Sequence, residues 1–211
     1  MSNNIKKDLL LFNELINNFL EQENTSPSNY YIEPENLYKI LDLSLNEGPA
    51  KPIDFKTTLK DLLDKTPRSS SKLFFNQLYG GRHSKAVLGD LLAVFLNNSM
   101  ATYKIAGPQV VIEKEILSQI YNIIGYDKNA GGTFPTGGSM CNFMSLVLAR
   151  DKALNSSPKD LSKLIVYTSE NSHYSISKNA SLSGIRKENI RYLNSDSFGK
   201  IKAVDFKNQI Y

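Results

Sequence analysis

A glycine-rich segment that runs into a predicted helix is the first candidate for chemistry. Residues 131–139 read Gly-Gly-Thr-Phe-Pro-Thr-Gly-Gly-Ser, and apolar residues at helical spacing follow. Free N–H groups at a helix N-terminus bind anions, glycines let a phosphate approach the main chain, and the hydroxyl of Ser139 adds a donor. No lysine follows the glycines and no G-x-G-x-x-G pattern is present, so neither a P-loop nor a dinucleotide fingerprint is indicated. The segment could also simply connect two helices.

His173 is the second candidate. It lies just beyond the C-terminal end of a predicted strand at residues 163–168, which is where ligands bind in open α/β sheets. An imidazole in that position could stack on a flat ring or move protons. A surface histidine at the start of the next helix is the alternative, and the local sequence does not decide between them.

The remaining polar candidates are weaker. Gln77, in a Phe-Asn-Gln-Leu stretch, could donate its amide to a carboxylate, although an ordinary polar loop residue explains it equally well. The single cysteine, Cys141, excludes an intrachain disulfide and is interpreted as a small core residue on a helix. One cysteine and two histidines are too few for a Cys/His zinc site, so no metal is expected.

The elements that must position these residues are predicted from hydrophobic periodicity. The chain has 211 residues, enough for one domain and a fraction of another. A strand, a helix and a second strand near the C-terminal end predict a parallel pair with a right-handed crossover. Helices are predicted at 5–23, from Pro34 to about 47, and at 54–64, 85–97, 109–124, 139–154, 174–182 and 205–211, with strands at 163–168 and 189–193.

Composition narrows the class of protein. The net charge is +4, with basic and acidic residues interspersed, so the concentrated basic stripe of a nucleic-acid-binding protein is missing. The sequence contains no apolar run long enough for a membrane span, and its first residues lack the apolar core of a secretory signal. A cytoplasmic protein that binds neither nucleic acid nor membrane is therefore expected.

Four segments, taken together, carry a resemblance to a known family. In order and spacing they resemble the group II pyridoxal-phosphate-dependent amino-acid decarboxylases, which include glutamate, cysteine-sulfinate and aromatic-amino-acid decarboxylases. The resemblance covers about residues 30–211 and is closest to the branch acting on acidic amino acids, because that branch carries Phe-Asn-Gln-Leu. The four segments are residues 74–82, 96–108, 132–142 and 168–175.

The resemblance implies a fold and a cofactor. The fold would be the α/β fold of type I pyridoxal-phosphate enzymes, like aspartate aminotransferase, present here in part. Residues 1–70 would form an N-terminal helical arm, and residues 71–211 the first part of the large cofactor-binding domain. The cofactor would be pyridoxal 5′-phosphate, and the substrate an acidic amino acid such as glutamate, aspartate or cysteine sulfinate. The partner would be a second copy in a homodimer, with the active site at the interface.

The resemblance also implies roles for single residues. Gly137, Gly138 and Ser139 would hold the cofactor phosphate, in agreement with the helix N-terminus argument. His173 would stack on the pyridine ring and assist proton handling. Gln77 would reach the substrate carboxylate, and Tyr103 would line the active site near the dimer interface.

One departure from the family pattern limits the expected activity. The family joins its cofactor to a lysine that usually follows a histidine, and no lysine here stands after a Pro-His pair. We therefore expect an incomplete chain that is inactive alone and associates readily, because a partial parallel sheet exposes its edges. The alternative is a non-catalytic protein, either half of a split enzyme that needs a complementary C-terminal polypeptide or a remnant that acts only by protein association.

Overall fold

The computed structural model describes residues 2–41, 48, 52–75, 78–127, 129–156 and 160–210, with the side chains of 2, 3, 52, 53 and 156 left out of that description. The chain divides into two compact units, Met1–Asn98 and Ser99–Tyr211. The predicted helical arm lies within the first unit, and its separate role stays a prediction. No helix in the described ranges is long and apolar enough to cross a membrane.

The first unit contains four helices in its described part. The predicted helices at 5–23, 54–64 and 85–97 are confirmed within a few residues. The helix predicted from Pro34 starts there but ends at Ile40, and the rest of that prediction, at 42–47, lies outside the described residues. The bounds are α1 Ser2–Gln22, α2 Pro34–Ile40, α3 Pro52–Lys65 and α4 Ser84–Leu96.

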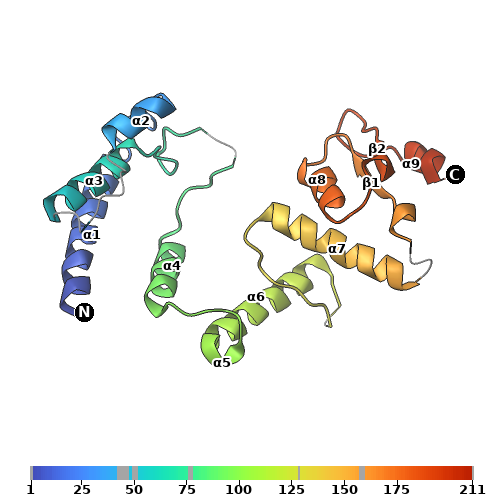
Figure 1. Ribbon diagram of the computed structural model, residues 1–211, viewed down its shortest axis with the longest axis horizontal. Coiled ribbons are helices and arrows are strands. Elements are labelled where there is room, and N and C mark those ends of the chain that lie inside the picture. Colours follow the sequence, from blue (N-terminus) through green and yellow to red (C-terminus); the bar gives the residue numbers. More distant parts are fainter. Residues whose placement is uncertain are drawn as a thin grey trace. The chain divides into compact units, whose positions relative to one another are not determined.

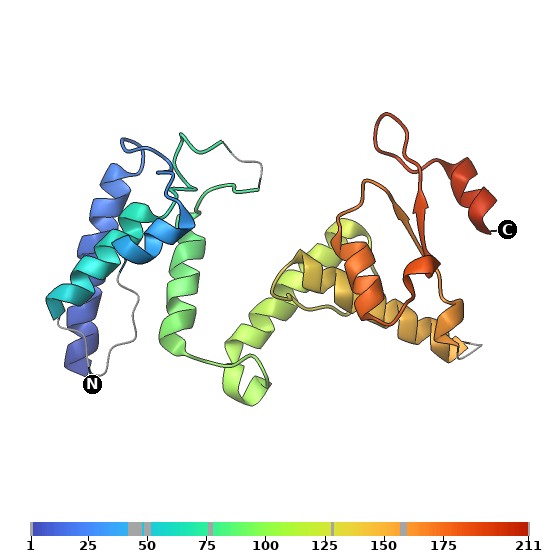
Figure 2. The ribbon, with the colours of Figure 1, turned by 45° about the horizontal axis from the view of Figure 1, so that its top comes forward.

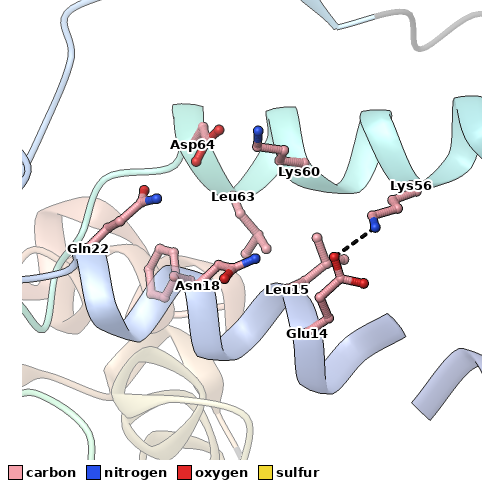
Figure 3. Close-up of a pocket in the computed structure, with 9 residues that line it drawn as sticks. Glu14, Leu15, Asn18, Gln22, Lys56, Lys60, Leu63 and Asp64 are labelled. Atoms are coloured by element: carbon pink, nitrogen blue, oxygen red, sulfur yellow. Dashed lines mark hydrogen bonds and ion pairs between the residues drawn. The ribbon is translucent and has the colours of Figure 1, made fainter. Parts of the chain in front are cut away.

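Helices α1 and α3 lie side by side in the first unit (Figure 1). Leu15 of α1 is buried, and it extends with Leu63 of α3 into the space between the helices (Figure 3). The ammonium group of Lys56 donates to a carboxylate oxygen of Glu14 at 2.7 Å. A cavity of about 410 Å³ between the two helices has these residues in its wall. It contains none of the residues that the sequence singles out for chemistry.

An ion pair between the exposed Arg82 and the buried Glu23 connects the segment before α4 to the residue that follows α1. Both carboxylate oxygens of Glu23 accept from the Nη2 atom of Arg82, each at 2.6 Å. Glu23 is only 7% exposed. The guanidinium groups of Arg68 and Arg82 lie 5.3 and 5.7 Å from the ring centroid of Phe19, within cation–π range. The backbone N–H of Arg68 donates to the carbonyl of Ser28 at 2.7 Å, which joins the loop after α3 to the loop after α1.

The second unit contains the predicted strands. The helices predicted at 109–124, 139–154, 174–182 and 205–211 are confirmed, apart from residue 211, which lies outside the described residues. The four-residue helix α5 was not predicted, because one turn is too short to show a period. The bounds are α5 Tyr103–Ala106, α6 Pro108–Ile124, α7 Gly138–Ser156, the 3₁₀ turn η1 Leu161–Lys163, β1 Val166–Ser169, α8 Ser175–Leu182, the 3₁₀ turn η2 Lys187–Asn189, β2 Ile190–Leu193 and α9 Ala203–Ile210.

Strand β1 begins three residues later than predicted because a capped turn precedes it. The carboxylate of Asp160 accepts from the backbone N–H and the hydroxyl of Ser162, at 2.9 and 2.6 Å. These hydrogen bonds favour the charged form and lower the pKa of Asp160 below its ordinary value. They close the turn η1, so Lys163 belongs to the turn and the strand starts at Val166.

The two strands are parallel, as predicted, with Val166 opposite Ile190 and Ser169 opposite Leu193. Helix α8 connects them and packs on α7 (Figures 1 and 2). Ala180, Ile185 and Ile190 form the buried core between the helix and the sheet. Burial of apolar surface here fixes α8, and α8 in turn carries the polar residues that meet the start of α7.

We predict that Glu23→Ala lowers the free energy of unfolding by about 1–2 kcal/mol, because it removes a buried carboxylate that accepts two charge-assisted hydrogen bonds from Arg82. Glu14→Ala, on the helix that Glu23 follows, is the matched control. Its ion pair with Lys56 is about half exposed on both sides, so its loss should cost at most about 1 kcal/mol. Urea unfolding of the two variants and the unmodified chain measures both values. Equal losses for the two variants would contradict the anchoring role of Glu23.

Candidate functional site

The N-terminus of α7 presents three hydrogen-bond donors, two backbone N–H groups and one hydroxyl. The backbone N–H groups of Met140 and Cys141 donate to the carbonyl of Gly137, at 2.9 and 3.1 Å. Within the described residues, the N–H groups of Gly138 and Ser139 and the hydroxyl of Ser139 make no hydrogen bond. They stand at the positive end of a 19-residue helix, where a negatively charged group is stabilised.

Open space lies in front of these donors. A Cβ atom added at Gly137 or Gly138 would meet nothing within 4 Å, so a bound group can come close to the main chain there. Gly132 has the opposite environment, because a Cβ atom added to it would lie 2.6 Å from the hydroxyl oxygen of Tyr121. The glycines at the two ends of the loop therefore serve different purposes: Gly132 lets the loop approach α6, and the pair before Ser139 leaves room for a ligand.

A carboxylate on α6 holds the middle of the loop. Glu113 accepts from the hydroxyl of Thr133 at 2.8 Å and from the backbone N–H of Phe134 at 3.1 Å, both through Oε1. These hydrogen bonds join the loop to α6 before the chain enters α7. The sequence analysis did not identify Glu113, and no local signal marks it, because its partners are 20 and 21 residues away.

Asn179 fixes α8 to the first turn of α7. Its amide nitrogen donates to the carbonyl of Ser139 at 2.6 Å, and the residue is 5% exposed. Asn179 and Ser139 both line a cavity of about 330 Å³ between the two helices, together with Tyr174, Ser175 and other residues. Asn179 carries no local signal of this role, because a polar residue on a helix more often faces solvent.

His173 follows a serine-rich turn at the end of β1. The hydroxyl of Ser169 accepts from the backbone N–H of Asn171 at 3.1 Å and from the hydroxyl of Ser172 at 3.3 Å. The N–H of Ser172 also donates to the carbonyl of Ser169 at 3.1 Å. The chain reverses within these residues, so His173 stands at the carboxyl end of the strand, as predicted. Its exposed ring lies against that of Tyr174, with centroids 4.4 Å apart.

A short polar network connects His173 to α7. The Nδ1 atom of the ring lies 2.8 Å from the hydroxyl oxygen of Ser175 and accepts from the N–H of Ser175 at 3.2 Å. The same hydroxyl oxygen accepts from the amide of Asn142 at 2.8 Å. Asn142 belongs to the first turns of α7, so the imidazole and the donors around Ser139 are held by the same pair of helices.

Other residues singled out in the sequence are placed elsewhere or not at all. Tyr103 stands on α5, is 66% exposed, and its hydroxyl makes no hydrogen bond within the described part of the chain. Gln77 lies outside the described residues. The interpretation of Cys141 as a core residue is wrong, since its side chain is exposed. It falls on a face of α7 that no described element covers, a fact the pattern of a single helix does not reveal.

Comparison with known proteins identifies the family of the chain. The family described as "Pyridoxal-dependent decarboxylase conserved domain" matches residues 34–211. The chain belongs to this family. Acidic amino acid decarboxylase GADL1 of Xenopus tropicalis is 32% identical over 186 residues, which cover 84% of this chain and 35% of the relative. Cysteine sulfinic acid decarboxylase of Mus musculus is 30% identical over 182 residues, covering 84% and 37%.

The solved structures confirm the predicted fold. The crystal structure of mouse CSAD superposes on all of this chain with a TM-score of 0.92 and 26% sequence identity, and the match takes in 46% of that chain. The fold is therefore the α/β fold of pyridoxal-phosphate-dependent decarboxylases, present in part. The chain spans about a third of the length of the curated relatives it matches.

We predict that Asn179→Ala lowers the free energy of unfolding of the second unit by about 1–2 kcal/mol. The change removes a buried hydrogen bond that joins α8 to α7 and leaves a small void. Lys178→Ala, one residue earlier on an exposed position of the same helix, should change it by less than about 0.5 kcal/mol. Denaturant unfolding followed by hydrogen exchange at the start of α7 would separate a local loosening from a global loss. An unchanged exchange rate in the alanine variant would contradict the role of Asn179.

Proposed function

We propose that this chain supplies the phosphate-side and ring-side half of the cofactor site of a pyridoxal-phosphate-dependent amino-acid decarboxylase. The observation that carries the proposal is the set of three donors at the start of α7, which hydrogen bonds join to α8 and to the network around His173. A phosphate needs donors and open space, and a flat ring needs a partner to stack on. Both requirements are met by residues that one helix pair positions.

The residues present fit the cofactor. The N–H groups of Gly138 and Ser139 and the hydroxyl of Ser139 would donate to the phosphate oxygens, and the α7 dipole would stabilise their charge. His173 would offer its imidazole face to the pyridine ring. When bound, the cofactor supplies the electron sink that accepts the electrons released as carbon dioxide leaves, while the protein supplies orientation and electrostatics. Gly137 would contribute through the carbonyl that shapes the first turn.

The proposed substrate is an acidic amino acid. The two relatives described above are named for acidic amino acids and for cysteine sulfinic acid, and this chain carries the Phe-Asn-Gln-Leu stretch typical of that branch. In this proposal Gln77 donates to the substrate carboxylate, and Tyr103 of α5 is a further residue that would contact the substrate. Glutamate, aspartate and cysteine sulfinate all carry a second acidic group that such donors would recognise.

The proposed setting is a cytoplasmic homodimer or a complex with a complementary C-terminal polypeptide. Helix α4 supports a partner of this kind. Its described residues include no buried side chain, although most of the helix is apolar. Exposed apolar side chains in one contiguous helix are unusual for a monomer and favour coverage by another part of the protein or a second chain. They are Leu88, Leu92, Val94, Phe95 and Leu96.

Binding of pyridoxine 5′-phosphate tests the proposal without interference from lysines. This compound carries the ring and the phosphate but no aldehyde, so it forms no covalent link with amino groups. We predict that it binds the chain more tightly than pyridoxine does, and that Ser139→Ala weakens its binding about tenfold by removing a donor to a charged group. Isothermal titration or ³¹P NMR measures the affinity.

Ser145→Ala is the matched control for that experiment. Ser145 is exposed on the same helix, past the first turn, and its loss should change the affinity by less than about twofold. Equal affinities for pyridoxine and its phosphate would contradict the assignment of the phosphate site. A control variant that weakens binding as much as Ser139→Ala would also contradict it.

We further propose that the 211 residues do not decarboxylate by themselves, because the family's lysine follows a histidine and here the two histidines precede Ser84 and Tyr174. Incubation with pyridoxal phosphate, followed by borohydride to fix the cofactor on lysine, should label several exposed lysines weakly. Peptide mapping measures the distribution. Stoichiometric labelling of one specific lysine, accompanied by carbon dioxide release from an acidic amino acid, would overturn this part of the proposal.

A further inference from the structure

We infer that Ser175 and Asn142 are positioning residues that fix the neutral His173 ring in the tautomer with its proton on Nε2. The tautomer itself does not depend on the proposed function. Only its consequence does, namely whether His173 presents a hydrogen-bond donor or an acceptor to the cofactor or substrate. The geometry that supports the tautomer belongs to the chain itself and needs no ligand.

The first step concerns the backbone. The N–H group of Ser175 donates to Nδ1 of His173 at 3.2 Å. A backbone N–H has no acceptor capacity, so the ring nitrogen opposite it must present its lone pair. The proton of a neutral imidazole then lies on the other nitrogen, Nε2.

The second step concerns the side-chain hydroxyl. The oxygen of Ser175 lies 2.8 Å from Nδ1 of His173 and accepts from the amide nitrogen of Asn142 at 2.8 Å. Because Asn142 uses a lone pair of this oxygen, the hydroxyl hydrogen is free to point at the ring. Ser175 is 1% exposed, so water does not compete for that hydrogen. Two donors from one residue therefore converge on Nδ1, and a third group sets the direction of the hydroxyl.

The consequence is a specific chemical role. With Nδ1 held as an acceptor, the ring offers an N–H donor at Nε2 and no lone pair there. In the proposed cofactor site His173 would stack with its face and donate a hydrogen bond with its edge. It would not act as a general base through Nε2. The three residues come from different elements. Asn142 belongs to α7, His173 to the turn before α8, and Ser175 is the first residue of α8.

The tautomer can be measured directly, because the chain has two histidines and His83 is exposed at the start of α4. His83→Gln leaves one ring, and ¹⁵N labelling of histidine then reports both of its nitrogens at a pH where the imidazole is neutral. We expect Nε2 to show the shift and the coupling of a protonated nitrogen and Nδ1 those of an acceptor. Ser175→Ala removes the hydroxyl donor but keeps the backbone N–H of residue 175, so it should move both shifts part of the way toward the averaged values of the same chain in urea.

Asn142→Asp gives a sharper test at a partly exposed position that tolerates change. A carboxylate there accepts the Ser175 hydroxyl hydrogen, so the hydroxyl no longer donates to Nδ1 and its oxygen presents a lone pair to the ring, in competition with the backbone N–H of Ser175. The two nitrogen shifts should then approach each other. Ser177→Ala is the matched control on α8, because its hydroxyl donates to the carbonyl of Tyr174 and not to the ring. It should leave both shifts unchanged.

Two results would overturn the inference. One is a protonated Nδ1 in the unmodified network, and the other is a set of shifts that neither Ser175→Ala nor Asn142→Asp alters while circular dichroism shows a folded chain. If Ser175→Ala unfolds, Asn142→Asp decides. The measurement uses no cofactor, so failure of pyridoxine 5′-phosphate to bind would contradict the proposed function and leave the tautomer result standing.

Discussion

The candidate site depends on the hydrogen bond between the amide of Asn179 and the carbonyl of Ser139. A helix N-terminus attracts anions wherever it occurs, but it becomes a site only when its first turn is held at a fixed place relative to other chemical groups. Asn179 provides that fixed place by joining α7 to α8. Helix α8 is itself held by the apolar core against β1 and β2, formed around Ala180 and Ile185. The position of the donors at the start of α7 therefore follows from the packing of a strand–helix–strand unit.

The same unit explains why the donors and His173 belong together. β1 ends at Ser169, the serine turn reverses the chain, and α8 begins at Ser175. The residues that leave a parallel strand at its carboxyl end face whatever binds there. The first residue of α8, Ser175, contacts Asn142, and its fifth residue, Asn179, contacts Ser139. Two contacts from one helix thus set both the ring and the anion donors, which leaves little freedom for one to move without the other.

Much of this arrangement follows from local sequence. Periodicity identifies α1, α3, α4, α6, α7 and α8, because each has apolar residues at helical spacing over two turns or more. The glycine pair before Ser139 and the histidine after a β-branched run are recognisable, because their chemistry depends on neighbours in the chain. The start of β1 was predicted too early because the Asp160 cap draws Lys163 into a turn, and apolar character alone does not report a cap. The helix α5 falls below the length at which a period is visible.

The residues that sequence analysis did not find share one property: their partners are distant in the chain. Glu113 meets the loop 20 residues later, Asn142 meets Ser175 across 33 residues, and Asn179 meets Ser139 across 40. An asparagine or glutamate on a helix has the same local signature whether it faces solvent or closes a network. Only the packing of α7 on α8 distinguishes the two cases. Cys141 illustrates the reverse, since a residue of ordinary core type lies exposed where no described element covers α7. The residues proposed to face the ligand are therefore readable from the sequence, while the residues that hold them in place become visible only when the fold brings their helices together.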